Sequence, residues 1–197
     1  DLEIVRRTSL KRFNAEFHSQ SVLEAAIELR ETGLDPARVE RVDVDVFQVA
    51  YDIIGGGEEG GKKLVRTKEE ADHSLPYMTA VALLDGQVLP AQYEPGRIAR
   101  ADVQNLLQRV HVKPDPELSA RFPREHGCRL RVTLDGGSTL VSEKSDYLGF
   151  LTRPAGWEEV ERKFRRLGGE GRIVELVRNL EEIRVGELCA ALAQVGR

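Results

Sequence analysis

The strongest constraint on the fold is a β-hairpin in the second half of the chain. In its first strand, residues 128–134, apolar and polar residues alternate. The apolar ones are Cys128, Leu130, Val132 and Leu134. The turn at residues 135–137 reads Asp-Gly-Gly, and residues 138–142 return. Because alternation with period two puts the apolar side chains on one face, the chain has to form a sheet that is half buried.

Two further segments have the pattern of a strand. In residues 39–47 three valines, Val42, Val44 and Val46, alternate with charged residues. Residues 109–113 place Val110 and Val112 on one side. With the hairpin, these segments predict a sheet of three or four strands.

Two longer helices are interspersed with the strands. After Ser19 the apolar residues recur at helical spacing, and Ser19 or Ser21 can cap the helix. Residues 78–84 are almost wholly apolar, which indicates a buried helix; Ser74 can cap it, and Pro76 suits its first turn. We therefore expect an α+β domain with a small antiparallel or mixed sheet and helices packed on one face.

The shorter segments are less regular. Thr67 and Glu70 have the spacing of a capping box. We expect short helices at residues 48–54, 101–108 and 116–122, and irregular structure at residues 90–100. The glycine-rich residues 55–61 lack the ending of a phosphate-binding P-loop and contain two glutamates, so they predict a surface loop.

The C-terminal part differs in kind. Residues 155–197 contain three amphipathic helical segments separated by glycines and have no strand pattern. We therefore divide the chain into an α+β domain, residues 1–154, and a C-terminal helical segment, residues 155–197. Because the chain begins in mid-pattern on Asp1, we expect it to be a piece of a longer protein.

Charge and hydropathy exclude two classes of partner. The net charge is −4 and the pI about 5.7, whereas a nucleic-acid-binding domain is typically basic. No apolar run approaches the roughly 20 residues that cross a bilayer. Cys128 and Cys189 have no metal-ligand spacing and are expected to be buried thiols in a reducing compartment. We expect no nucleic acid, no membrane and a cytoplasmic location.

Polar residues gather at the starts of the two longer helices. Residues 11–21 read KRFNAEFHSQS, and residues 72–77 read DHSLPY. A helix N-terminus carries a partial positive charge and unpaired N–H groups, so either cluster could bind an anion. The first cluster alone is more typical of an ordinary helix cap beside a solvated basic turn than of a site. The second cluster favours a site, because a buried helix does not need four polar groups at its start.

These two motifs resemble the C-terminal part of the MmgE/PrpD family. KRFNAEFHSQS is followed about fifty residues later by TKEEADHSLPYMTAVALLDG, and DPELSARFP, the hairpin and the helix that ends near Phe164 come in the same order. The family comprises 2-methylcitrate dehydratases, cis-aconitate decarboxylases and iminodisuccinate epimerases. Its members have a large helical domain, a smaller α+β lid, and final helices that return to the helical domain. The resemblance implies that residues 155–197 would pack on an all-helical domain outside this chain.

The resemblance also implies the chemistry. It places the active site between the two domains and implies no metal or organic cofactor. Loss of water from an alcohol flanked by carboxylates needs a proton carrier and cations. By the family match Lys11, His18 and His73 are the catalytic candidates. The candidates for orienting the substrate are Arg12, Gln20, Ser74 and Tyr77.

The partners follow from the same resemblance. We expect a small di- or tricarboxylate substrate, an N-terminal helical domain on the same polypeptide or on a separate subunit, and a homodimer. Other key residues come from the helical domain, so this chain alone should lack activity. Glu16 could equally be a partner of Lys11 or a surface acid. His111, in a strand, and His126, beside a turn, are expected to be structural or exposed.

Three functions remain open at this point. The first is a cofactor-independent hydro-lyase of the 2-methylcitrate dehydratase type, which would belong to propionate catabolism and which the AEFHSQS motif favours. The second is the same scaffold acting as a cis-aconitate decarboxylase or an iminodisuccinate epimerase. The third is a non-catalytic lid-like module or the small subunit of a split enzyme.

Overall fold

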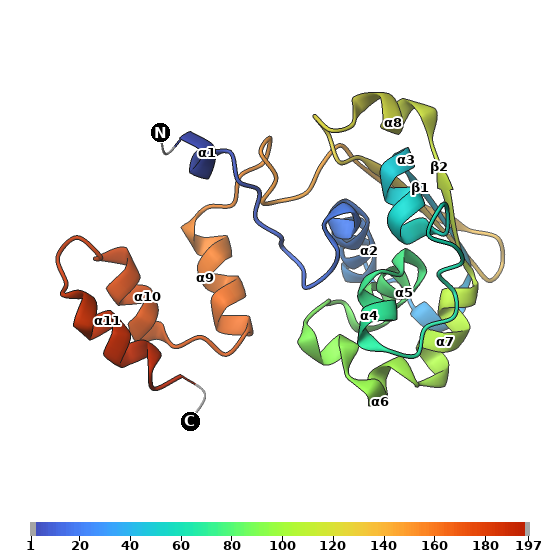
Figure 1. Ribbon diagram of the computed structural model, residues 1–197. Coiled ribbons are helices and arrows are strands. Elements are labelled where there is room, and N and C mark those ends of the chain that lie inside the picture. Colours follow the sequence, from blue (N-terminus) through green and yellow to red (C-terminus); the bar gives the residue numbers. More distant parts are fainter. Residues whose placement is uncertain (1–2, 196–197) are drawn as a thin grey trace. The chain divides into compact units, whose positions relative to one another are not determined.

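The computed structural model describes residues 3–195. The chain divides into two compact units, Asp1–Pro154 and Ala155–Arg197. Each is described by itself (Figure 1).

The first unit is built on a four-stranded mixed sheet in the order β2-β1-β3-β4. The strands are β1 (Val39–Val46), β2 (Val110–Pro114), β3 (Cys128–Leu134) and β4 (Thr139–Lys144). β1 pairs parallel with β2 and antiparallel with β3, and β3 pairs antiparallel with β4. Val44 of the central strand lies between Val112 on one side and Leu130 on the other. The expected α+β class, sheet and hairpin are confirmed.

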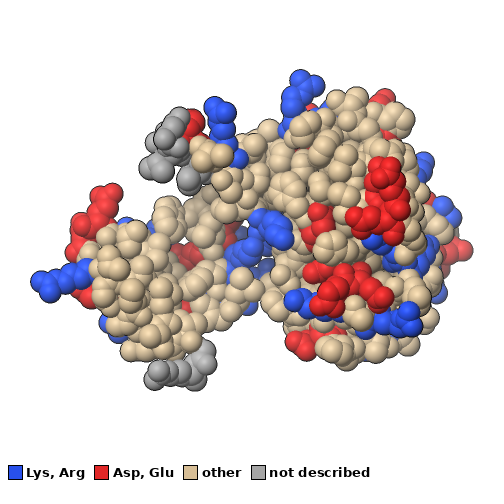
Figure 2. All heavy atoms as spheres, viewed as in Figure 1, with Lys and Arg blue, Asp and Glu red and all other residues tan. Residues whose placement is uncertain are grey.

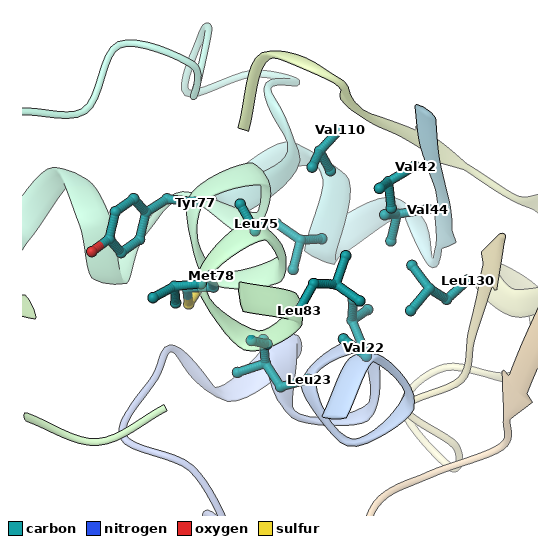
Figure 3. Close-up of a cluster of buried hydrophobic side chains, with 14 of the residues drawn as sticks. Val22, Leu23, Val42, Val44, Leu75, Tyr77, Met78, Leu83, Val110 and Leu130 are labelled. Atoms are coloured by element: carbon teal, nitrogen blue, oxygen red, sulfur yellow. The ribbon is translucent and has the colours of Figure 1, made fainter. Parts of the chain in front are cut away.

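Two helices pack on one face of this sheet and bury it. They are α2 (Gln20–Glu31) and α5 (Leu75–Asp85), which contact each other. α2 lies against β3 and β4, and α5 lies against β2. Figure 3 shows the side chains that meet between the layers, such as Val22 and Leu83 from the helices and Val44 and Leu130 from the sheet. All four are fully or almost fully buried, so the alternation of the strands and the apolar surface of α5 serve one core.

Shorter helical elements connect these layers. They are α1 (Glu3–Arg6), η1 (Phe17–Ser19), η2 (Pro36–Arg38), α3 (Gln48–Ala50), η3 (Tyr51–Gly55), α4 (Lys68–Asp72), η4 (Pro90–Tyr93), α6 (Pro95–Ile98), α7 (Ala101–Gln108) and α8 (Pro116–Arg121). The capping box of Thr67 and Glu70 is present at the start of α4. The expectation that residues 90–100 are irregular is wrong: η4 and α6 each start with a proline at the first turn, where its missing N–H costs nothing.

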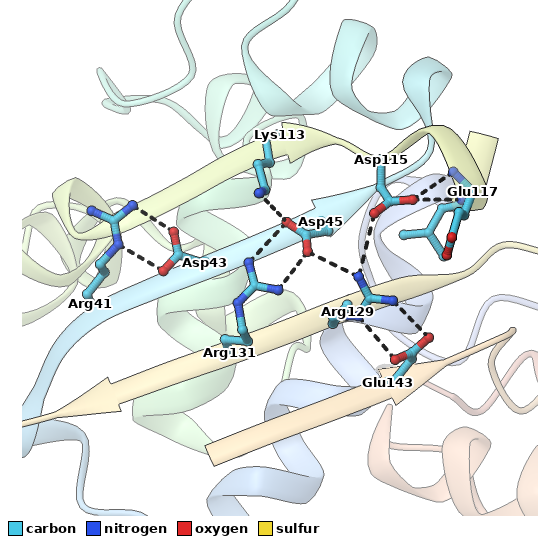
Figure 4. Close-up of polar contacts among 10 residues, drawn as sticks. Arg41, Asp43, Asp45, Lys113, Asp115, Glu117, Arg129, Arg131 and Glu143 are labelled. Carbon is cyan, nitrogen blue, oxygen red and sulfur yellow. Dashed lines mark hydrogen bonds and ion pairs between the residues drawn. The ribbon is translucent and has the colours of Figure 1, made fainter. Parts of the chain in front are cut away.

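The other face of the sheet carries a network of ion pairs (Figure 4). Asp45 is only 2% exposed, and its carboxylate receives Arg131 at 2.7 Å. Lys113 and Arg129 each lie 3.7 Å from it. Arg129 also pairs with Glu143 at 3.1 Å. Since these residues come from all four strands, the network links the strands across the sheet.

The second unit contains α9 (Trp157–Arg166), α10 (Gly171–Arg178) and α11 (Val185–Leu192). Glu161 pairs with Arg165 at 2.8 Å and with Arg178 at 3.0 Å. The Arg178 guanidinium lies over the ring of Trp157, 5.5 Å from its centroid. Cys189 is exposed in α11, so the expectation of two buried cysteines is wrong for this one.

The surface has mixed charge. Figure 2 shows acidic and basic side chains interspersed on the visible face, as a net charge of −4 on 197 residues suggests. Among the described residues, no helix has the length and apolar character needed to cross a membrane.

Candidate active site

The loop before α2 is shaped by the side chain of Gln20. Its Oε1 accepts the backbone N–H of Phe13 at 2.9 Å. Its Nε2 lies 3.3–3.4 Å from the carbonyl oxygens of Phe13, Ala15 and Glu16. Phe13 and Ala15 are themselves buried, so both the hydrogen bonds to Gln20 and the packing of these two side chains hold the loop. Gln20 is fully buried and uses both ends of its amide on this loop, and its predicted contact with substrate stays a prediction.

Within this loop Glu16 and His18 form a carboxylate–histidine pair. Glu16 Oε1 lies 2.7 Å from His18 Nδ1, and Oε2 accepts the backbone N–H of His18 at 2.7 Å. Glu16 therefore caps the 3₁₀ turn η1. Ser19 lies at the N-cap of α2, as expected, but its hydroxyl makes no capping bond and donates back to the Glu16 carbonyl at 2.6 Å. A carboxylate on Nδ1 fixes the orientation of an imidazole and stabilises its protonated form. The pair leaves Nε2 as the nitrogen for proton exchange.

Aromatic rings surround His18. Its ring lies edge-on to Phe17 and Phe47, at centroid distances of 5.7 and 5.5 Å, and tilted to Phe122 at 6.1 Å. His126 stacks on it at 5.6 Å. The side chain of His18 is 17% exposed, so it keeps an opening to the surface from within an apolar wall.

Two cations flank the same loop. Lys11 Nζ donates to the carbonyl oxygen of Ala15 at 3.1 Å. Arg12 lies 3.3 Å from the buried carboxylate of Glu24, which also receives Arg153 at 2.9 Å. Burial alone raises the pKa of Glu24, but the backbone N–H of Leu148 and the two arginines outweigh it, and the pKa lies below its usual value. Glu24 thus remains a carboxylate that anchors Arg12 beside the loop.

The second predicted cluster lies at the start of α5. His73 Nδ1 is 2.5 Å from Asp72 Oδ1, and the His73 side chain is 54% exposed. Ser74 accepts the backbone N–H of Tyr77 as the N-cap of α5 and donates to the carbonyl of Lys62. Tyr77 is fully buried, and burial raises the pKa of its phenol to about 12.

The hydroxyl of Tyr77 is already engaged within the domain. It donates to the carbonyl of Gln92. Ser74 and Tyr77 therefore hold α5 in place within this structure, and their predicted contact with substrate stays a prediction. His73 is the member of this cluster that faces solvent, in an open groove of about 430 Å³ whose walls include Lys62 and Glu69.

The structure gathers Lys11, Arg12, His18 and Gln20 around one loop, and it places His73, Ser74 and Tyr77 elsewhere. Within the described chain, the ring contacts and hydrogen bonds of His18 involve none of residues 72–77. The two histidines have the same arrangement, an imidazole with its Nδ1 on a carboxylate of a nearby residue. Residues 3–195 hold no group of three or more His, Cys, Asp or Glu side chains that could bind a metal ion.

The structure adds two residues to the first cluster. His126 was expected to be structural or exposed; it is buried, which fits the structural alternative, and its ring lies near His18, which the sequence did not indicate. Glu16 was expected to be either a partner of Lys11 or a surface acid, whereas the structure pairs it with His18. The spacing of Glu16 and His18 offered a signal, since a carboxylate two residues before a backbone N–H can cap a turn.

The fold and these clusters define an α+β domain that presents carboxylate-bound imidazoles and cations, a combination suited to proton transfer on an anionic substrate. The model of the MmgE/PrpD C-terminal domain matches residues 13–183. The chain belongs to the MmgE/PrpD family.

Curated relatives agree with this assignment. The human cis-aconitate decarboxylase is 26% identical over 197 residues, covering 93% of this chain and 38% of the human protein. The 2-methylcitrate dehydratase of Salmonella typhimurium is 31% identical over 152 residues, covering 73% of this chain and 30% of that enzyme. The 2-methylcitrate dehydratase of Escherichia coli K12 is 29% identical over 129 residues, covering 62% of this chain and 26% of that enzyme. The chain thus spans less than two fifths of the length of these relatives.

Proposed function

We propose that this chain is the C-terminal portion of a cofactor-independent hydro-lyase that removes water from 2-methylcitrate or a similar tricarboxylate. The observation that carries the proposal is the Glu16–His18 pair at 2.7 Å, on a loop that also bears Lys11 and Arg12. The similarity to two bacterial 2-methylcitrate dehydratases supports the choice of substrate class.

In the proposed reaction, a base removes a proton from the carbon next to a carboxylate and an acid protonates the departing hydroxyl. His18 exchanges a proton through Nε2, while Glu16 on Nδ1 keeps the ring oriented and offsets the positive charge that it gains. His73, on Asp72, is the second proton carrier.

Lys11 and Arg12 hold the carboxylates of the substrate. A guanidinium can bind a carboxylate through two parallel hydrogen bonds, and an ammonium acts as a point charge. Arg12 is suited to this role because Glu24 holds it from the buried side while 38% of its side chain is exposed.

We propose that the chain works with an all-helical N-terminal domain, on the same polypeptide or as a separate subunit, and as a cytoplasmic homodimer. Trp157 and Leu167, each at least half exposed in the second unit, are the kind of apolar surface that such a domain would cover. The native mass of the intact protein tests this assembly.

A second function is favoured by one comparison. The match to human cis-aconitate decarboxylase covers 93% of this chain, more than the matches to the two dehydratases. The same residues would then bind cis-aconitate; carbon dioxide would leave, and a histidine would give a proton to the carbanion that this loss creates.

The test is to incubate the full-length protein separately with 2-methylcitrate, citrate, cis-aconitate and iminodisuccinate and to identify the products by chromatography and ultraviolet absorbance. Methyl-aconitate from 2-methylcitrate supports the first proposal. Itaconate from cis-aconitate, with no product from 2-methylcitrate, would replace it with the second. No turnover of any of the four would favour a non-catalytic module.

Variants then test the residues. We expect His18→Ala to lower kcat by about 10²- to 10⁴-fold, the usual contribution of a general acid or base. Lys11→Ala and His73→Ala should each lower turnover more than about tenfold without unfolding the protein. His111→Ala is the matched control, because His111 is exposed on β2 and should leave kcat unchanged.

A further inference from the structure

His126 lies in a box of aromatic rings directly behind His18. It precedes β3, and the residue is only 4% exposed. The ring centroids of Phe150 and Phe17 lie 4.6 and 4.7 Å from the centroid of its ring, and those of Phe47 and Phe122 lie at 5.2 and 5.3 Å. The four phenylalanines come from four separate parts of the first unit, so the box is a built feature of the tertiary structure.

The contact between His126 and His18 differs from the other ring contacts of His18. The two imidazole planes are inclined by only 13°, at a centroid distance of 5.6 Å. The contacts of His18 with Phe17 and Phe47 have interplanar angles of 74° and 65°. Among the described rings around His18, His126 is therefore the one whose plane is nearly parallel to that of His18, with the two rings offset. In a closely packed interior, a parallel ring beside an imidazole limits how far the imidazole can tilt out of its plane.

The backbone of His126 is tied to the same helix start as His18. The Ser21 hydroxyl, in the first turn of α2, donates to the carbonyl oxygen of His126. The two rings are thus held in register by a buried hydrogen bond between segments that are far apart in the sequence.

His126 carries no charge that would oppose a proton on His18. Burial lowers the pKa of His126 to about 4; the nearby His18 lowers it further, and Glu16 raises it. Glu16 and His18 are the titratable groups that act on it. Its Nδ1 is buried and has no hydrogen-bond partner among the described residues.

We propose that His126 is a positioning residue for His18: its nearly parallel imidazole, fixed in the aromatic box, keeps the His18 ring in the plane that places Nδ1 on Glu16 and Nε2 toward the substrate. The reactive role of His18 rests on the function proposed above, whereas the orientation of its ring does not. His126 acts through His18 and does not itself touch the substrate.

The discriminating variants are His126→Leu and His126→Phe. Both fill the box with an apolar side chain and remove the unpaired nitrogen, but only phenylalanine offers a flat face. In the first measurement, ¹⁵N-histidine nuclear magnetic resonance at pH 7 reports on which ring nitrogen of His18 carries the proton. This measurement needs no substrate, so it decides the proposal even if the protein turns over none of the four carboxylates.

We expect the wild-type chain and His126→Phe to show His18 with its proton on Nδ1, and His126→Leu to show a mixture of both tautomers. In the full-length enzyme, His126→Leu should lower kcat at least about tenfold with KM within about twofold, and His126→Phe should stay within about threefold of wild type. A His126→Leu protein that matches wild type in tautomer and kcat would overturn the proposal. Equal impairment of both variants would overturn it as well, since the flat ring would not then be the cause.

Discussion

Replacing Glu24 with glutamine tests the buried ion pairs that hold the loop of the candidate site. Glu24 is 1% exposed on α2. Its carboxylate receives Arg153 at 2.9 Å, Arg12 at 3.3 Å and the backbone N–H of Leu148 at 2.8 Å, and Lys144, which mainly pairs with Glu28, lies 3.9 Å from it. Glutamine has the same shape and can still accept from Leu148, but it has no charge for these cations. The substitution therefore isolates the electrostatic contribution.

The expected loss follows from the exposure of the partners. A hydrogen bond to a charged group contributes about 1.5–3 kcal/mol, and breaking a fully buried ion pair costs about 3–5 kcal/mol. The side chains of Arg12 and Arg153 are 38% and 42% exposed, so both can turn to water once the charge is gone. We therefore expect Glu24→Gln to lower the free energy of unfolding by about 2–3 kcal/mol at pH 7.

The assay is urea unfolding followed by circular dichroism. With an m-value of about 2–3 kcal/mol per molar urea, the midpoint should fall by about 1 M. Glu28→Gln is the matched control: Glu28 lies one turn further along α2 and pairs with Lys144, but its side chain is 44% exposed, so its loss should stay below about 1 kcal/mol.

The pH dependence of the stability difference between wild type and Glu24→Gln provides a second test. The pKa of Glu24 is lower in the folded chain than in the unfolded one, so its contribution is fully present above the unfolded value and is lost as the pH falls through the folded value. The difference between wild type and Glu24→Gln should thus be constant from pH 7 to about 5.5 and shrink below about pH 4. A loss under about 0.5 kcal/mol at pH 7, or a difference that persists undiminished at pH 3, would refute the reasoning.

Two further predictions use matched pairs within the chain. Tyr77→Phe should lower the free energy of unfolding by about 1–1.5 kcal/mol, because it removes the hydrogen bond to the Gln92 carbonyl. Tyr93→Phe should leave the free energy of unfolding unchanged, because the buried Tyr93 hydroxyl has no partner among the described atoms. Urea unfolding of both variants tests the difference. A thiol reagent should label Cys189 but not Cys128 in the native chain, because Cys128 is buried and burial raises the pKa of its thiol. In urea both cysteines should react, and peptide mass spectrometry identifies the labelled site. Rapid labelling of Cys128 in the native chain would contradict the packing of β3.

Local patterns predicted most of the fold. The alternation in residues 39–47 and the hairpin at residues 128–142 gave three strands, and Ser74 with Pro76 gave the start of α5. The sequence did not predict that β1 pairs in parallel with β2, because the alternation of apolar and polar residues is the same whether the neighbouring strand runs parallel or antiparallel. The four-residue turns η4 and α6 were missed because they are too short to have a period.

The candidate site divides in the same way. Lys11, Arg12 and His18 are neighbours in the sequence, so a motif could place them together. His126 is more than a hundred residues away and reaches His18 only because α2 and the segment before β3 pack against each other. Glu16 contacts His18 Nδ1 because it caps the 3₁₀ turn η1, and the residue types alone did not specify that turn.

The central position of β1 has a consequence for synthesis on the ribosome. Both of its neighbours, β2 and β3, come later in the chain, so β1 emerges with neither edge paired. At about 5–20 residues per second, roughly 3–14 seconds separate the completion of Val46 from that of Pro114, the end of β2. During this interval the alternating valines of β1 have no neighbouring strand to pair with, and the strands β3 and β4 against which α2 packs are still missing. The nascent chain thus offers a strand with two open edges for seconds, which is the period in which a chaperone would protect it from pairing with another nascent chain.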